Sequence, residues 1–205
     1  YRGTNEDLFK GPADWISPSP DGGYRDNPPA ATGSKVILSD TDHLWGIGGN
    51  RSWVWKSFCR GMNVLFMDPY HEARAKGERE ETWTDHLGDA PRLDARWDSI
   101  RRNMGYALSF AKRMDLAAAV PHDELASTRY CLAKPGAEYL IYLPEGGDVG
   151  VDLTAAGEGL EVEWLNPSTG RSASAPMTSG GGLRHFTAPF GGDGVLYIFA
   201  KGGGG

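Results

Sequence analysis

The sequence predicts an α+β protein in two parts, a parallel strand–helix–strand unit followed by an antiparallel β-sandwich. Two continuously apolar runs, KVILS (residues 35–39) and NVLFM (residues 63–67), flank a helical segment. Such runs are typical of strands in a parallel sheet that is covered on both faces. After Pro121, short β-type segments recur between turn signals, which favours an antiparallel sandwich. We therefore divide the chain at residue 120, within a transition near residues 116–126.

The first part contains one strand–helix–strand unit between two long loops. Residues 1–34 are rich in Pro, Gly, Asp and Asn without periodicity, which predicts a long ordered loop. Asn50 is a good N-cap for a helix over residues 51–60, and Gly61 is well placed to end it. The run NVLFM then supplies the second strand, so the spacing fits a βαβ unit.

A charged segment and a long helix complete the first part. Residues 71–92 are predicted to form a second loop, and residues 93–115 form the clearest helix of the chain. Apolar residues recur in this helix at steps of three and four. They are Trp97, Ile100, Met104, Ala107, Leu108, Ala111 and Met114.

The second part, residues 121–205, contains seven predicted strands. These strands cover residues 127–133, 137–143, 148–153, 160–166, 172–176, 183–188 and 195–200. Two of them alternate apolar and polar residues, which predicts one buried and one solvated face. The alternation of Trp164 with Val162 and Leu160 predicts that the indole lies on the buried face.

Composition narrows the classes of function. The net charge is −6 and no basic run is present, which argues against nucleic acid or an anionic membrane as the main partner. No apolar run approaches the roughly 20 residues that span a bilayer. Cys59 and Cys131 are expected to be buried thiols, and the spacing of His, Cys and acidic residues predicts no metal site and no cofactor.

The beginning of the chain leaves its cellular location open. Tyr1 is neither a starting methionine nor part of a signal peptide, so we expect the chain to belong to a longer polypeptide. A signal in the missing part would make the protein secreted or periplasmic. Without such a signal it would be cytoplasmic.

Acidic and aromatic side chains follow the two apolar runs of the first part. Reactive groups gather at the C-terminal ends of parallel strands. Carboxylates stabilise an oxocarbenium-like transition state, and aromatic rings stack on the C–H faces of sugars. The residues concerned, which predict a carbohydrate substrate, are Asp40, Asp42, His43, Trp45, Asp68 and Tyr70.

Structural roles are the alternatives for the same residues. Aspartate at a strand end is often only a turn former or a helix cap, and His43 would then be a hydrogen-bonded structural histidine. Tryptophans 45, 53 and 55 could all be core residues, although Trp45 lies in a glycine-rich loop and is expected to be the most exposed of the three. The run Gly46-x-Gly48-Gly49 before a helix could suggest phosphate binding, but it lacks a full nucleotide-binding pattern.

Longer motifs resemble a known family of enzymes. The stretch VILSDTDHLWGIGGNRSWVWKSFCRGMNVLFMDPY (residues 36–70) resembles the seventh and eighth strand region of (β/α)8 glycoside hydrolases of the apiosidase-like superfamily. Residues 8–29 resemble the loop after the sixth strand, and residues 101–116 resemble the last barrel helix. The resemblance implies that residues 1–120 are a partial (β/α)8 barrel, containing its last two strands and helices.

The second part resembles the domain that follows such barrels, which is labelled a collagen-binding domain of a collagenase. The resemblance is carried by the motifs EYLIYLPEGG, VEWLNPSTG and FTAPFGGDGVLYI. It leaves open an accessory module that binds carbohydrate or collagen without catalysis. A purely structural tail is the preferred alternative, because the strands show no row of exposed aromatic residues.

For the enzyme, the resemblance implies a retaining mechanism with an acid/base carboxylate at the fourth strand and a nucleophile at the seventh. Related enzymes place Glu at the nucleophile position, whereas this sequence offers Asp40 or Asp42, of which we prefer Asp40. His43, Trp45, Asp68 and Tyr70 would bind the sugar. The fourth strand is absent, so the implied partners are a carbohydrate substrate and the missing N-terminal barrel half, and we expect the chain alone to be inactive.

Overall fold

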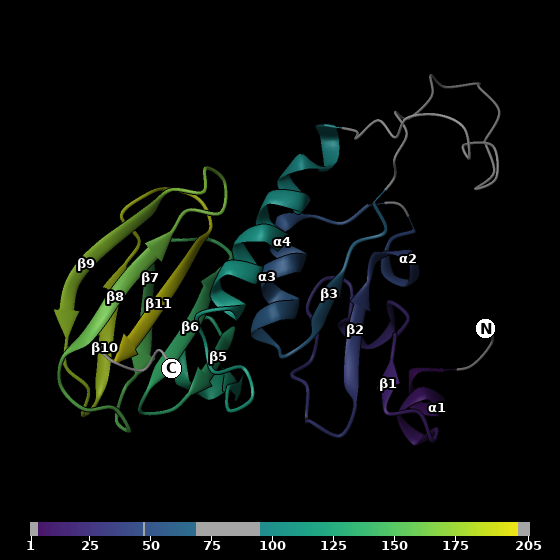
Figure 1. The fold of residues 1–205 in the computed structure, drawn as a ribbon, viewed down its shortest axis with the longest axis horizontal. Coiled ribbons are helices and arrows are strands. Elements are labelled where there is room, and N and C mark those ends of the chain that lie inside the picture. The colour runs from purple at the N-terminus through teal and green to yellow at the C-terminus, as the bar shows by residue number, and fades with distance from the viewer. Residues whose placement is uncertain (1–3, 47, 69–94, 201–205) are drawn as a thin grey trace.

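The computed structural model describes residues 4–46, 48–68 and 95–200 (Figure 1). Its first sheet has three parallel strands in the order β1-β2-β3. The strands are β1 (Trp15–Ile16), β2 (Val36–Asp40) and β3 (Asn63–Leu65). The parallel pairing of β2 with β3 agrees with the predicted βαβ unit, and β1 adds a third strand that the sequence did not predict.

The N-terminal segment is not the simple loop that its composition predicts. It contains α1 (Asn5–Lys10), β1 and the 3-10 helix η1 (Asp21–Gly23). A capping box starts α1, since Thr4 and Asp7 each bond the backbone N–H of the other. These elements are too short to leave a periodic pattern, and so the loop prediction is wrong for them.

Two long helices, α3 and α4, and one short helix, α2, follow the strands of the parallel sheet. The helix α3 (Arg51–Cys59) begins where Asn50 Oδ1 accepts a hydrogen bond from the backbone of Trp53 at 2.8 Å. A single helical turn, α2 (Thr41–Leu44), precedes it. The helix α4 (Asp98–Ala111) follows the 3-10 turn η2 (Ala95–Trp97) and is shorter than predicted. Both long helices lie between the parallel sheet and the second, larger sheet (Figure 1).

The second part forms an antiparallel sheet of six strands in the order β4-β5-β6-β11-β8-β9. Its strands are β4 (Val120–Pro121), β5 (Cys131–Lys134), β6 (Glu138–Leu143), β8 (Leu160–Leu165), β9 (Ser172–Thr178) and β11 (Gly194–Ala200). A two-stranded sheet of β7 (Asp148–Asp152) and β10 (Leu183–Thr187) completes the sandwich. The short 3-10 helix η3 (Asp123–Leu125) connects β4 to β5.

The central strands β6 and β11 of the six-stranded sheet are buried on both faces. On β6, Leu140 and Tyr142 belong to a core that includes the helices, whereas Tyr139 and Ile141 belong to a core shared with β7 and β10. The indole of Trp55 on α3 stacks on Tyr142 at a centroid distance of 6.4 Å and meets Phe110 edge-on. One core therefore crosses the boundary near residue 120, and we call it the shared core.

Polar contacts also cross this boundary. Arg51 on α3 forms a two-pronged ion pair with the buried Asp193, whose carboxylate also accepts a hydrogen bond from Tyr142 at 3.1 Å. Asn103 on α4 accepts a hydrogen bond from Trp55 Nε1 and donates one to the carbonyl of Pro167. These contacts connect the helices to strands and turns of the second part.

Two further predictions can be compared with the structure. Cys59 and Cys131 are free, buried thiols, as predicted. Within the described ranges, none of the helices combines the length and the apolar character needed to cross a membrane.

Candidate functional site

The parallel sheet has one face that no helix of the described residues covers. Ile37 and Ser39 of β2 point toward α3, where Ser39 Oγ accepts a hydrogen bond from Trp53 Nε1 at 2.9 Å. The alternate residues point to the opposite side. We call this side the open sheet face, and its members from register are Trp15, Val36, Leu38, Asp40, Asn63 and Leu65.

Asp40 lies at the C-terminal end of β2 on the open sheet face. It is also the N-cap of α2, since its Oδ1 accepts a hydrogen bond from the backbone of Asp42 at 3.0 Å. The capping role that the sequence left open is therefore present. Among the described residues its Oδ2 has no hydrogen-bond partner. This oxygen can therefore contact a ligand while Oδ1 caps the helix. Asp42 is exposed in the first turn of α2.

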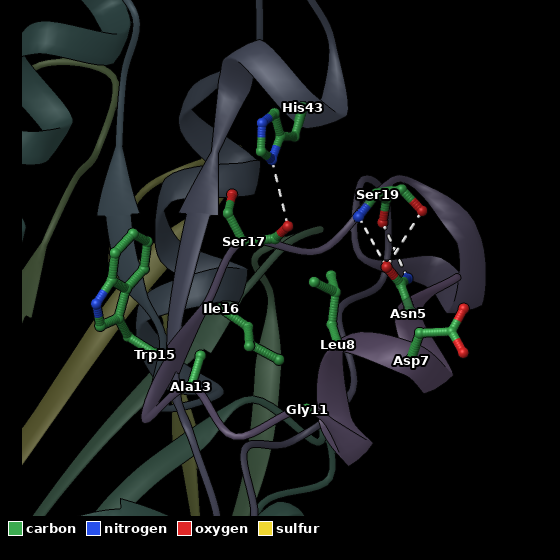
Figure 2. A pocket seen from close by; sticks show the side chains of 10 residues that line it. All are labelled: Asn5, Asp7, Leu8, Gly11, Ala13, Trp15, Ile16, Ser17, Ser19 and His43. Carbon is green, nitrogen blue, oxygen red and sulfur yellow. Dashed lines mark hydrogen bonds between the residues drawn. The ribbon is translucent and has the colours of Figure 1, made fainter. Parts of the chain in front are cut away.

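His43 lies over the end of β1. Its Nδ1 is 3.2 Å from the backbone carbonyl oxygen of Ser17 (Figure 2). A carbonyl oxygen only accepts, so Nδ1 carries a proton, and Nε2 of the neutral ring remains a hydrogen-bond acceptor.

A groove of about 630 Å³ runs between α1 and β1 and ends at His43 (Figure 2). Apolar side chains of Leu8, Trp15 and Ile16 form much of its wall, and Asn5 and Ser19 bond each other along it. We call it the β1 groove. Of the five predicted site residues that the structure describes, His43 is the one that lines it.

Sequence reasoning missed Trp15 and Ser17 as residues of this groove. The signal that could have found both is the short run WIS, which is too brief to stand out from the surrounding Pro and Gly residues.

Trp45 is half-buried, whereas Trp53 and Trp55 are 1% and 0% exposed. The prediction that Trp45 is the most exposed of the three is therefore confirmed. The guanidinium of Arg25 lies over its ring at 5.2 Å, so one face of the indole is covered by a cation. Its Nε1 is buried without a hydrogen-bond partner among the described residues.

Asp68 forms an ion pair with Arg101 on α4. Both of its oxygens accept hydrogen bonds from Arg101 on α4, at 2.7 and 2.5 Å, and Arg101 also bonds Asp98. The hydrogen bond to Asp68 is the main cause that raises the pKa of Arg101. The pair ties the segment after β3 to α4. Tyr70, the sixth predicted residue, lies outside the described residues.

The segments that follow β2 and β3 are neighbours, because the backbone of Met67 donates to Thr41 Oγ1 at 2.9 Å. Asp40, Asp42 and His43 thus share one strand end, with Asp68 on the adjacent segment. Of these four described residues, His43 lines the β1 groove. In the same described ranges, no group of three or more His, Cys, Asp or Glu is arranged to hold a metal ion.

Comparison with protein families matches one part of the chain. Residues 118–198, less than half of the chain, match the family described as "Putative collagen-binding domain of a collagenase". The match covers the six-stranded and two-stranded sheets. No curated protein matches the sequence.

Solved structures with a similar fold are named as glycoside hydrolases. One, titled "Glycoside hydrolase", is 14% identical with a TM-score of 0.57, over 82% of this chain and 43% of its own. Another, a glycoside hydrolase family 5 protein from Bacteroides vulgatus, is 16% identical with a TM-score of 0.56, over 83% of this chain and 42% of its own. This chain therefore spans less than half the length of these structures, and it shares their mixed α/β fold with antiparallel sheets.

Proposed function

We propose that this chain is the C-terminal portion of a glycoside hydrolase that cleaves O-glycosidic bonds of an oligo- or polysaccharide. The observation that carries the proposal is Asp40, a carboxylate at the C-terminal end of the middle parallel strand, on the open sheet face. Catalytic groups gather at this end of parallel strands. The fold likeness to chains named glycoside hydrolase supports the proposal.

In the proposed mechanism, Asp40 is the nucleophile of a retaining enzyme. Attack of a carboxylate oxygen on the anomeric carbon forms a glycosyl ester while an acid protonates the leaving oxygen, and water then hydrolyses the ester. The acid/base carboxylate must lie about 5 Å away. It would come from the other part of a (β/α)8 barrel of the apiosidase-like type, so residues 1–205 alone should not turn over substrate.

The local geometry favours Asp40 over Asp42 for this role. Asp40 ends a strand that is paired on both sides, and its cap hydrogen bond restrains the carboxylate while Oδ2 is left for attack. Asp42 lies two residues further on, exposed in the first turn of α2, where its carboxylate makes no hydrogen bond among the described residues.

The remaining predicted residues would contact the sugar in different ways. His43 can accept a hydrogen bond from a sugar hydroxyl at Nε2, because its other nitrogen is engaged by Ser17. Trp45 would offer the ring face that Arg25 leaves uncovered. Asp68 is held by Arg101, yet each carboxylate oxygen has a second lone pair for a hydroxyl. We propose Tyr70 as a further lining residue from its sequence position alone.

The test uses the polypeptide extended upstream of Tyr1. Asp40→Asn should lower kcat by about 1000-fold or more, since it removes the nucleophile. The control Asp26→Asn, at an exposed aspartate, should leave kcat unchanged. A fluorinated-sugar inactivator should add its mass to the peptide that contains Asp40. Unchanged activity of Asp40→Asn, or product with inverted anomeric configuration, would reject the assignment.

A binding module is the second candidate, and the description of the matched family favours it. In this chain most aromatic side chains of the larger sheet, among them Tyr142, Trp164 and Tyr197, are buried, and Phe199 is partly buried. Aromatic platforms for a sugar or collagen would have to be exposed. We therefore propose that the second part stabilises the enzyme. Binding of soluble collagen or polysaccharide by the chain with a dissociation constant in the low micromolar range would favour the module instead.

A further inference from the structure

A hollow of about 580 Å³ lies at one end of the second part, where the turn between β8 and β9 meets the segment that joins β10 to β11. Its volume is in the range of pockets that bind small molecules. Every described residue that lines it belongs to the second part, so it is distinct from the site around Asp40. We call it the β9 hollow and define it by Asn166, Arg171, Ser172, Pro189 and Phe190.

The β9 hollow carries a positive charge in an acidic protein. Of the described residues that line it, Arg171 is the one that is charged at neutral pH, whereas the whole chain has a net charge of −6. The guanidinium is exposed and has no ion-pair or hydrogen-bond partner among the described residues. A guanidinium at a concave surface attracts an anion, and its planar fork fits a carboxylate through two parallel hydrogen bonds.

Two further hydrogen-bond donors line the same hollow. Asn166 Oδ1 accepts hydrogen bonds from the backbone of Ser168 at 2.9 Å and of Thr169 at 3.1 Å. This fixes the orientation of the amide and leaves its Nδ2 hydrogens to donate elsewhere. The hydroxyl of Ser172 also has no hydrogen-bond partner among the described residues. Amide and hydroxyl donors beside a guanidinium are the groups that would bind the oxygens of an acidic sugar.

Phe190 supplies an apolar wall next to these donors. Its ring is partly buried and meets the indole of Trp164 edge-on, at a centroid distance of 6.3 Å. This packing holds the ring in one orientation, while the part of it that is not buried lines the hollow beside Pro189. The C–H faces of a pyranose stack on such rings.

The turn that carries Asn166 and Arg171 is held in place without a ligand. The carbonyl of Pro167 accepts a hydrogen bond from Asn103 Nδ2 on α4 at 3.0 Å. Within the turn, the backbone N–H of Gly170 donates to the carbonyl of Asn166 at 2.8 Å, and that of Asn166 donates to the carbonyl of Arg171 at 2.9 Å. A rigid site loses less conformational entropy when it binds a ligand.

We propose that the β9 hollow binds a uronic acid residue of an acidic polysaccharide. Arg171 pairs with the sugar carboxylate, Asn166 and Ser172 donate to sugar oxygens, and Phe190 lies against the ring. The inference goes beyond the proposed function, because it concerns a different site and involves no bond cleavage. A single small site should bind with a dissociation constant of about 0.1–1 mM, which is weaker than the low micromolar value expected of a dedicated binding module.

The test follows backbone amide NMR signals of residues 1–205 during titration with a trisaccharide of galacturonic acid. The signals of Ser172 and Phe190 should shift with the acid. The methyl ester of the same trisaccharide keeps the sugar and removes the charge, so it should bind about tenfold more weakly.

Arg171→Gln should lower the affinity for the acid about tenfold and leave the affinity for the methyl ester unchanged, since the charged pair is lost in both cases. Its remaining amide signals should be those of the unchanged fold, because Arg171 is exposed. The matched control is Arg129→Gln, at an exposed arginine in the turn before β5. It makes the same change in charge and should leave both affinities within about twofold.

Several outcomes would overturn the proposal. Equal losses in Arg171→Gln and Arg129→Gln would mean that binding follows net charge alone. Shifts confined to other residues, or none at about 10 mM ligand, would reject the site. Tighter binding of a sulfated trisaccharide at the same residues would reject the carboxylate, and binding of a collagen peptide there would assign the hollow to a polypeptide. Because the test measures no hydrolysis, any of these results leaves the role of Asp40 to its own assay.

Discussion

The two large sheets of this molecule differ in how completely they are covered. The six-stranded antiparallel sheet has helices on one face and the β7–β10 sheet on the other, and its central strand β6 is buried along its whole length. The parallel sheet has helices on one face and bare apolar residues on the other. An antiparallel sheet can tolerate one solvated face, whereas a parallel one rarely does. The parallel sheet, which normally needs both faces covered, is the one that the described residues cover on one face only.

This contrast separates two groups of residues. Residues of the shared core stabilise the fold of residues 1–205, whereas residues of the open sheet face would add stability only if another surface covered them. Side chains in the shared core already make their contacts. Side chains on the open sheet face make few, so their removal from this chain should have little effect on folding.

Replacement of Trp55 should give the largest effect. Trp55→Ala removes ring contacts with Phe110 and Tyr142 and leaves Asn103 Oδ1 without its donor, which should cost about 3–5 kcal/mol of the free energy of unfolding. The matched control Trp15→Ala, on the open sheet face, should cost at most about 0.5 kcal/mol. Urea unfolding measures both. Equal costs would contradict the contrast between the two sheets.

Loss of the ion pair between Arg51 and Asp193 should have the next largest effect on the free energy of unfolding. Arg51→Ala leaves the carboxylate of Asp193 buried with Tyr142 as its remaining hydrogen-bond donor, which should cost about 1–3 kcal/mol. Lys10→Ala breaks the exposed pair with Glu6 within α1 and should cost about 0.2–0.5 kcal/mol. A loss below that of Lys10→Ala would mean that Arg51 does not help to join the two parts.

High pH should weaken the shared core. Burial raises the pKa of Tyr142 and of Tyr197, so both bind their protons more tightly when folded than when unfolded. Their contribution is therefore complete below the unfolded pKa of about 10 and is lost as pH rises through the folded values, by about 1 kcal/mol for each at pH 11. Urea midpoints between pH 8 and 11 measure the loss, and Tyr142→Phe should reduce the slope. A flat profile would contradict the prediction.

The same burial should make the thiols inert. It raises the pKa of Cys59 to about 12, and that of Cys131 also lies well above its usual value. A thiol-specific disulfide reagent at pH 8 should therefore label neither cysteine in the folded chain and both in urea. Rapid labelling without urea would show that the shared core opens readily.

Replacement of Asp40, the candidate nucleophile, should have only a small effect on the free energy of unfolding. Asp40→Ala removes the N-cap of α2 and should cost residues 1–205 about 1 kcal/mol. Asp42→Ala, at an exposed helical position, should be near neutral. A much larger cost at Asp40 would give it a mainly structural role and weaken its assignment as nucleophile.

Local patterns in the sequence predicted most of the elements. Alternation along residues 148–153 and 160–166 predicted β7 and β8 and the buried position of Trp164, and Asn50 predicted the start of α3. The two-residue strand β1 and the one-turn helix α2 are too short for any period to reveal.

Contacts between distant residues could not be predicted in the same way. The pair of Asp68 with Arg101 joins residues 33 positions apart, and that of Arg51 with Asp193 joins residues 142 positions apart. No local pattern encodes such pairs. For the same reason, composition suggested a boundary near residue 120 where the structure has a continuous core, and no local pattern placed His43 beside the β1 groove.

The shared core limits how this protein can be rearranged by gene fusion. A graft of residues 121–205 onto an unrelated catalyst would present Leu132, Tyr142 and Tyr197 to water, because the helices that cover them would be left behind. The smallest portable unit therefore includes α3 and α4 and begins before Arg51. Recombination near residue 120 would divide the shared core and expose an apolar surface on each of the two fragments.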